Sequence, residues 1–147
     1  MLSEWAERDS LLSFEYGEEN KQAWCSIEWT TSSAGLAYSI IRDNPALDPE
    51  IKQQIEIWLK KVAQKQISYP GGSKFTCCNN HLYWRGLEAA IVGVVTNDNK
   101  LFRFGIQKYL SALKAMNKDG SFPLEMQREE RAIHYQNFAI LPLVYIQ

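Results

Sequence analysis

The chain has 147 residues and a formal net charge of −1, with 46% of its residues hydrophobic and 12% aromatic. This composition can bury the core of one domain, spanning residues 1–147, and excludes a disordered chain. The near-zero charge, without a basic tract among the aromatics, argues against nucleic-acid binding. The absence of a long apolar run argues against a membrane span.

Three helices are predicted in the N-terminal half. Residues 2–12 fit a short amphipathic helix, and residues 18–41 fit a long one because their apolar positions recur at helical spacing. Asp48 followed by Pro49 is a good start signal, since aspartate caps a helix and proline suits its first position. The third helix, over residues 49–67, carries its apolar side chains on one stripe.

Two further helices are predicted in the middle of the chain. Asn79 or Asn80 can cap a helix that continues through the apolar residues 87–95 and ends before residues 97–99. Residues 101–116 form the next amphipathic helix. Three glycines on these helices are expected to mark close helix packing rather than ligand contact: Gly86, Gly93 and Gly105.

The C-terminal region predicts a turn and a last helix. Residues 118–121 form the turn, and Phe122 before Pro123 is expected to bar an immediate helix. The last helix starts at about Arg131, and Pro142 is expected to kink or end it. About six helices with short connections and no convincing strand pair predict an all-α fold of antiparallel helical hairpins.

The three cysteines are Cys25, Cys77 and Cys78. An odd count with one adjacent pair is not a disulfide framework, and adjacent cysteines rarely bridge because disulfide geometry is demanding. We therefore expect Cys77 and Cys78 to be packing residues. No Cys-x-x-Cys pair or His/Cys ligand spacing occurs, so no zinc site is predicted.

Two polar clusters are candidate functional sites. Residues 79–84, Asn-Asn-His-Leu-Tyr-Trp, lie at a helix start, where free backbone N–H groups and the helix dipole favour an anionic ligand. The alternative is a plain cap beside a half-buried histidine. In residues 128–137, if helical, Arg128, Arg131 and Tyr135 share one face. The alternative there is a solvated charged face with a core tyrosine.

Four segments in this order resemble the alginate lyases of polysaccharide lyase family five. They are NNHLYW from Asn79, VVTNDNKLF from Val94, DGSFPLE from Asp119 and REERAIHYQNFAILPL from Arg128. The resemblance implies that the helical hairpins form part of an α/α toroid. It also implies cleavage of alginate, an acidic polysaccharide rich in mannuronate, by β-elimination that leaves unsaturated uronate ends, with no cofactor and no metal.

The same resemblance implies four catalytic residues: Asn80, His81, Arg128 and Tyr135. Arg128 is expected to clamp the uronate carboxylate with its planar fork, and Asn80 to donate to the same group. Tyr135 is expected to act as the acid. His81 either neutralises the carboxylate or serves as base, and the choice of base between His81 and Tyr135 stays open.

Supporting roles are expected for neighbours of these residues. Tyr83 and Trp84 can stack on sugar rings, although a core role fits Trp84 as well. Arg131 is a supporting residue at the substrate, and His134 matches no catalytic position of the resembled family and is treated as a neighbour only.

The resembled enzymes are longer than this chain, with a cleft-lining N-terminal segment and further C-terminal helices. We therefore expect this chain to be a weak or inactive lyase that self-associates through exposed apolar helix faces such as Ile140–Ile146. Most of these enzymes are periplasmic, which predicts the same location, although residues 1–8 carry no signal peptide.

Two other functions fit the same residues. One is a helical module that binds uronate polymers without cleaving them, and the other is a structural helical domain with a partner chain. Release of an unsaturated uronate distinguishes the lyase from the module, and the structural domain binds no polyuronate. The residues leave open the preference for mannuronate or guluronate, endo or exo action, and the oligomeric state.

Overall fold

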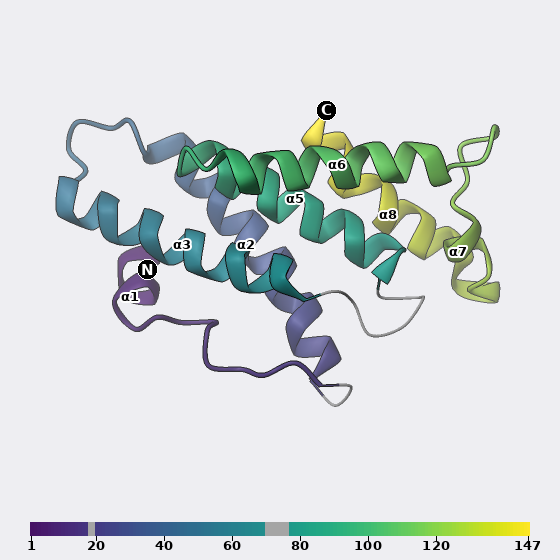
Figure 1. The fold of residues 1–147 in the computed structure, drawn as a ribbon, viewed down its shortest axis with the longest axis horizontal. Helices are drawn as coiled ribbons and strands as arrows, with labels where there is room; N and C mark the ends of the chain where they lie inside the picture. Colours follow the sequence, from purple (N-terminus) through teal and green to yellow (C-terminus); the bar gives the residue numbers. More distant parts are fainter. Residues whose placement is uncertain (18–19, 70–76) are drawn as a thin grey trace.

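The computed structural model describes residues 1–17, 20–69 and 77–147. All regular elements in these ranges are helices, which confirms the all-α prediction. Successive long helices run in opposite directions, so α2 with α3 and α5 with α6 form antiparallel hairpins (Figure 1). No helix within the described ranges has the length and apolarity needed to span a bilayer.

The N-terminal helices are α1 (Leu2–Glu7) and α2 (Lys21–Ile41). Helix α1 ends earlier than the predicted residue 12, because Asp9 and Leu11 adopt positive φ angles of 45° and 68° that no α-helix accommodates. The predicted start of the second helix at residues 18–19 lies outside the described residues.

Helix α3 (Pro49–Ser68) begins where the sequence predicts. The Oδ1 atom of Asp48 accepts hydrogen bonds from the backbone N–H groups of Glu50 at 2.7 Å and Ile51 at 3.4 Å. Pro49 occupies the first position, where no N–H is needed. The helix packs one face against α1 and α5.

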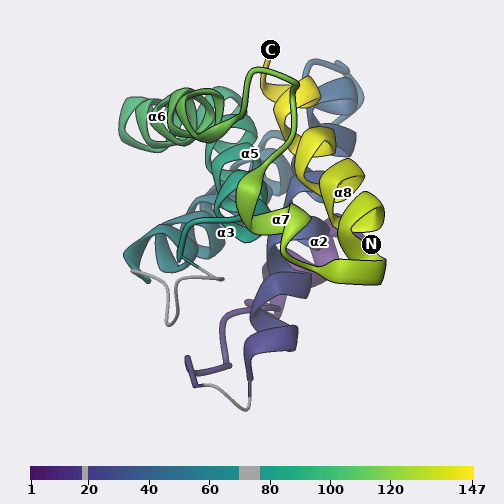
Figure 2. The ribbon, with the colours of Figure 1, turned by 90° about the vertical axis from the view of Figure 1, so that its right-hand side faces the viewer.

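Helix α5 (Asn80–Val95) begins after one of its two predicted caps, whereas α6 (Asn99–Ala115) begins two residues before the predicted residue 101, at a cap that was not predicted. Asn79 Oδ1 accepts from the His81 N–H at 3.2 Å, and Asp98 Oδ1 accepts from the Lys100 N–H at 2.9 Å. Helix α5 lies in the middle of the fold, in contact with α2, α3, α6 and α8 (Figures 1 and 2). It is therefore buried along most of its length.

Close packing of α5 on α6 depends on glycines, as predicted. A Cβ atom added to Gly93 would lie 2.4 Å from the Phe102 backbone nitrogen, and one added to Gly105 would lie 2.6 Å from the Gly86 carbonyl oxygen. Such distances leave no room for a methyl group, so these two helices approach each other backbone to backbone.

The C-terminal region holds α7 (Pro123–Met126), a 3-10 turn η1 (Glu129–Arg131) and α8 (Ala132–Ile146). The expectation that residues 122–123 bar an immediate helix is wrong, because proline is well suited to a first helical position and starts α7 here. Helix α7 packs against α8.

The prediction that Pro142 can end the last helix is also wrong. Helix α8 continues through Pro142 to Ile146. Proline lacks the N–H that would bond the carbonyl four residues earlier, which is that of Phe138. The indole Nε1 of Trp84 donates to this Phe138 oxygen at 3.1 Å and takes the place of the missing bond.

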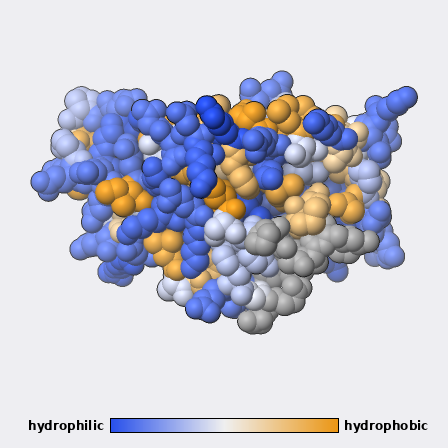
Figure 3. All heavy atoms as spheres, viewed as in Figure 1, coloured by the Kyte–Doolittle hydropathy of each residue, from blue (hydrophilic) through white to orange (hydrophobic). Residues whose placement is uncertain are grey.

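Buried apolar side chains form a main core between α2, α3, α5 and α6 and a smaller cluster between α5, α6 and α8. Some large apolar side chains stay exposed, among them Ile40, Ile133, Val144 and Tyr145. Figure 3 shows apolar atoms reaching the surface between hydrophilic ones on one face. The self-association expected from such faces stays a prediction.

Candidate active site

The first turn of α5 is held by a buried carboxylate. Glu125, on α7, accepts hydrogen bonds from the backbone N–H of Asn80 at 2.7 Å and from its side-chain Nδ2 at 3.0 and 3.1 Å. Both side chains are fully buried. A negative group at a helix N-terminus satisfies N–H groups that lack intrahelical partners. The sequence analysis missed Glu125 because nothing local links it to Asn80.

This contact changes the expected role of Asn80. Its amide nitrogen was expected to donate to the carboxylate of a substrate, but here it donates to Glu125. Its Oδ1 atom is buried without a hydrogen-bond partner among the described residues. The catalytic role of Asn80 therefore stays a prediction, and Glu125 is the group that fixes its orientation.

Arg128 and Tyr135 lie together, although not as one helical face. The expectation of a shared face is wrong because Glu129 adopts φ of 53° and Arg128 precedes the helix. The Arg128 guanidinium carbon nevertheless lies 4.6 Å from the centre of the Tyr135 ring, a cation–π contact. Both side chains are half-buried, whereas Arg131 is exposed. The guanidinium of Arg128 and the phenol of Tyr135 therefore lie side by side.

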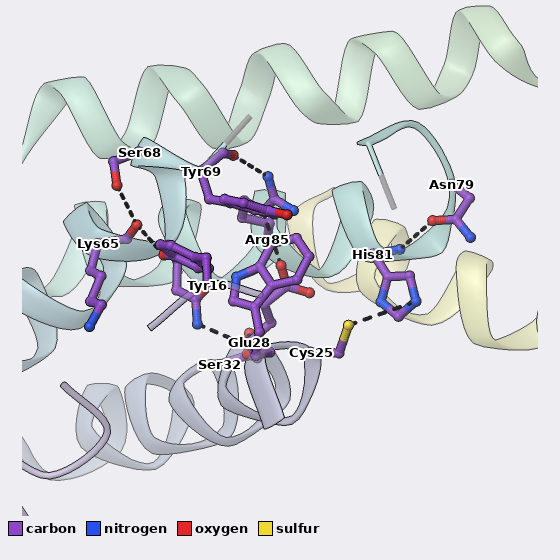
Figure 4. Close-up of polar contacts among 12 residues, drawn as sticks. Tyr16, Cys25, Glu28, Ser32, Lys65, Ser68, Tyr69, Asn79, His81 and Arg85 are labelled. Atoms are coloured by element: carbon purple, nitrogen blue, oxygen red, sulfur yellow. Dashed lines mark hydrogen bonds and ion pairs between the residues drawn. The ribbon is translucent and has the colours of Figure 1, made fainter. Parts of the chain in front are cut away.

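His81 lies on the first turn of α5 and faces α2. Its Nε2 atom is 3.8 Å from the Sγ atom of buried Cys25 (Figure 4). The histidine itself is half-buried. Cys25 was not expected near this histidine, because 56 residues separate the two and only the packing of α2 on α5 joins them.

The two polar clusters lie at the same end of the α5–α8 pair. Trp84, one turn after Asn80, packs its ring 5.1 Å from that of Phe138, which lies one turn after Tyr135. In Figure 2, α7 lies at this end, beside the starts of α5 and α8. The structure therefore brings the four candidate catalytic residues to one region of the fold.

Tyr83 and Trp84 belong to the core in this structure. Their exposed fractions are 3% and 8%. The Tyr83 ring packs 5.1 Å from Phe122, and Trp84 packs against Trp29 and Phe138. Neither ring offers a face to a sugar, so the expected stacking role is not supported and the core alternative holds for both. The reason is that α8 and the segment before α7 cover this side of α5.

A buried charge cluster lies next to His81. Arg85 Nε donates to Glu28 Oε1 at 3.0 Å, and its Nη1 donates to the Tyr69 carbonyl at 2.8 Å (Figure 4). Burial raises the pKa of Glu28 to about 8, against the opposing effect of Arg85, and raises the pKa of Glu88 well above its ordinary value. Two buried carboxyls lie near one guanidinium, so burial and the neighbouring Glu28 both favour the protonated form of Glu88.

Cys77 and Cys78 form a disulfide. The expectation that they are packing residues is therefore wrong. The bridge lies where the chain enters α5, before that helix begins at Asn80. It immediately precedes the Asn79 cap.

Among the residues that the structure describes, one group of side chains can hold a metal ion. Cys25, Glu28 and His81 each offer a ligand atom, and these atoms lie within 4.8 Å of one another. The expectation of no zinc site relied on ligand spacing along the chain, which a cluster assembled from two helices does not follow.

Comparison with known proteins connects this geometry to a family. The family model described as alginate lyase matches residues 2–147. The chain is 32% identical over 143 residues to a polysaccharide lyase of Stenotrophomonas maltophilia (strain K279a), covering 97% of this chain and 42% of that protein. It is 31% identical over 150 residues to an alginate lyase of Pseudomonas syringae pv. syringae (strain B728a), covering 99% and 39%.

Solved structures agree with this assignment. The crystal structure of alginate lyase A1-III from Sphingomonas species A1 superimposes with a TM-score of 0.92 at 44% identity, covering 99% of this chain and 40% of that one. A histidine-to-alanine variant of A1-III complexed with a tetrasaccharide gives a TM-score of 0.93 at 43% identity. The match confirms that the hairpins have the arrangement of part of an α/α toroid. The chain spans about 40% of the length of these proteins.

Proposed function

We propose that this chain, which belongs to the alginate lyase family, cleaves alginate at mannuronate by β-elimination and leaves unsaturated uronate ends. One observation carries the proposal. The Arg128 guanidinium lies 4.6 Å from the Tyr135 ring, at the end of the fold where His81 lies in the first turn of α5. An anion clamp, a phenol and an imidazole are the groups that this elimination needs.

The chemistry sets three requirements. The proton on C5 of a uronate is weakly acidic, and its removal places negative charge on the adjacent carboxylate. A site must neutralise that charge, remove the proton, and protonate O4 as the bond between O4 and C4 breaks. Stabilisation of the developing charge is usually the largest of these contributions, and a positioned acid or base adds roughly 10²–10⁴-fold.

The described residues supply a group for each requirement. Arg128 carries a planar fork of N–H donors that matches a carboxylate. Tyr135 donates its phenolic proton to O4. His81 is half-buried, with its ring towards α2. It either takes the C5 proton, or offsets the carboxylate charge while Tyr135, as the phenolate, takes the C5 proton and passes it to O4. No step in this scheme requires a redox group.

Ultraviolet absorbance tests the proposal, because elimination conjugates a new C=C bond with the carboxylate. Purified chain is incubated with poly-mannuronate, and polymer binding is measured in parallel by sedimentation. We expect absorbance to rise with time. Binding without a rise would favour a non-catalytic uronate-binding module, and neither binding nor a rise would favour a structural domain.

We also propose that the protein works in the periplasm or another oxidising compartment. The Cys77–Cys78 disulfide supports this location, because such bonds persist in oxidising compartments and are rare in the cytosol. Alkylation of thiols in freshly broken cells, followed by peptide mass analysis, tests it. Alkylated Cys77 and Cys78 in the native protein would contradict this location.

A further inference from the structure

We propose that Cys25, Glu28 and His81 form a binding site for a borderline-soft divalent cation of the zinc class, and that the bound ion inhibits the enzyme by occupying His81. The binding stands on the geometry of these three residues alone. The inhibition additionally rests on the proposed lyase function, in which His81 takes part.

The positions of the ligand atoms match a tetrahedral ion. One ligand atom of each residue lies within 4.8 Å of the others, and Cys25 Sγ is 3.8 Å from His81 Nε2. Bond lengths of about 2.3 Å to sulfur and about 2.0–2.1 Å to nitrogen at a tetrahedral angle place these atoms about 3.6 Å apart. The sulfur–nitrogen pair is close to this separation, and side-chain rotation within the 4.8 Å cluster has to bring the Glu28 oxygen to the ion.

The ligand types select the class of ion. Cys25 and Glu28 lie three residues apart on α2 and so project from one face of that helix, and His81 projects from the first turn of α5. Sulfur, carboxylate oxygen and imidazole nitrogen are the ligands of Zn²⁺ in proteins. Ca²⁺ and Mg²⁺ prefer oxygen ligands alone and are excluded by this set.

A buried, partly unsatisfied carboxylate points independently to a ligand. Glu28 is fully buried. Its Oε1 accepts from Arg85 at 3.0 Å, while its Oε2 has no hydrogen-bond partner within the described residues. Arg85 thus fixes the orientation of the carboxylate through Oε1, as outer-shell groups do at metal sites, and leaves Oε2 for a cation.

Protons are released when the ion binds. The thiol of Cys25 loses its proton to solvent as the sulfur–metal bond forms, and Glu28 binds the ion as a carboxylate, so these two ligands reduce the combined charge of the ion and Arg85 from three to one. The half-buried His81 is the exposed edge of the site, since the other two ligands are buried. An ion therefore enters from the side of His81, and the ring nitrogen that holds it can no longer accept a proton.

Cobalt titration tests the binding without any need for turnover. All three cysteines lie in the described part of the chain and two of them form the disulfide, so Cys25 carries the one thiol when no reductant is present. We expect Co²⁺ to produce a thiolate-to-cobalt charge-transfer absorption in the near ultraviolet. It should saturate at about one ion per chain and disappear when Zn²⁺ displaces cobalt.

Matched variants locate the site. Cys25→Ser and His81→Ala should abolish the absorption, and Glu28→Gln should weaken Co²⁺ binding by at least about tenfold. The controls are His134→Ala, which removes the other histidine of the chain, and Glu88→Gln, which removes a buried carboxyl that is not a ligand. Both controls should retain the parental absorption, with folding checked by circular dichroism.

The outcomes separate the site from the function. No cobalt absorption in the parent, or an unchanged absorption in His81→Ala, would overturn the site. The half-buried position of His81 makes that variant decisive even if Cys25→Ser fails to fold. Zn²⁺ should inhibit turnover over the same concentrations that displace cobalt. Full turnover with the site occupied would overturn the inhibition, whereas an inactive parent leaves the cobalt result intact and counts only against the lyase proposal.

Discussion

At the scale of single residues, Arg128 and Tyr135 decide whether the site can eliminate. Arg128→Ala should lower kcat/KM by about 10²–10³-fold, because a fixed donor to the developing charge is lost. Tyr135→Phe should lower it by about 10²–10⁴-fold, because the proton for O4 is lost while the ring and its contact with Arg128 remain. Initial rates of product absorbance measure both effects.

The matched control is Arg131→Ala, since Arg131 is an exposed arginine three residues from Arg128. Its rate should stay within a few-fold of the parent. Thermal melting of all three variants should be nearly unchanged. Extensive unfolding of Tyr135→Phe, with normal activity in the folded remainder, would show a structural role instead.

Glu125 is predicted to act through Asn80. Glu125→Ala removes the acceptor of the Asn80 backbone and side-chain donors, which leaves buried N–H groups without partners. We expect a loss of about 1.5–3 kcal/mol in the free energy of unfolding, the range for hydrogen bonds to a charged group. Urea denaturation measures it. A stability equal to that of the parent would show that water replaces the carboxylate.

At the scale of elements, Trp84 allows α8 to pass through Pro142. Trp84→Phe should cost about 1–3 kcal/mol beyond the loss of packing, because the Phe138 carbonyl then lacks a donor. In the Pro142→Ala variant, residue 142 regains a backbone N–H that can donate to the Phe138 carbonyl. Trp84→Phe should therefore cost less free energy of unfolding in that variant than in the parent. A double-mutant cycle by urea denaturation measures this coupling. Additive effects would refute it.

Helix starts could be predicted from the sequence because their causes are local. Asp48 and Asn79 each accept from backbone N–H groups two or three residues later, so the neighbouring residue types reveal them. Asp98 caps α6 in the same way but was not predicted, because residues 97–99 were read only as the end of the preceding helix. The start of α7 was not predicted because proline disrupts the interior of a helix but favours its first position. The sequence did not show that Pro123 occupies a first position. The positive φ of Glu129 likewise has no marker in the residue type.

The contacts that complete the site could not be predicted, because they join separate elements. Glu125 meets Asn80 across 45 residues, and Cys25 meets His81 across 56. A single sequence gives residue types but not the packing of α2 and α7 on α5. The residues themselves indicated two polar clusters, but the four catalytic roles came only from the resemblance, and spacing placed Arg128 on a helix that it does not join.

At the scale of the whole molecule, the buried acids should make stability depend on pH. Burial raises the pKa of Glu28 from 4.5 to about 8, and Glu88 rises in the same direction. Between these pH values the folded state binds more protons than the unfolded state, so stability falls as pH rises. We expect a decrease of about 1–3 kcal/mol from about pH 5 to about pH 8, measured by urea denaturation.

A neutral isostere tests the cause of this decrease. Glu88→Gln keeps the volume and removes one titration, so its stability should fall less over the same pH range. Glu4→Gln changes an exposed acid and should leave the parental pH dependence unaltered. Equal slopes for the parent and Glu88→Gln would assign the effect to other groups.

The proposed function is tested most directly by mass analysis of the products from poly-mannuronate. The chain is used at a concentration comparable to that of the polymer, so that even slow cleavage is detected in a single turnover. Each elimination splits the chain into one saturated fragment and one unsaturated fragment, and only the unsaturated fragment lacks one water relative to a hydrolysis product. We predict such unsaturated fragments from the parent and not from Tyr135→Phe. An intact polymer, fragments with hydrolytic masses only, or equal amounts of unsaturated product from Tyr135→Phe would contradict the account.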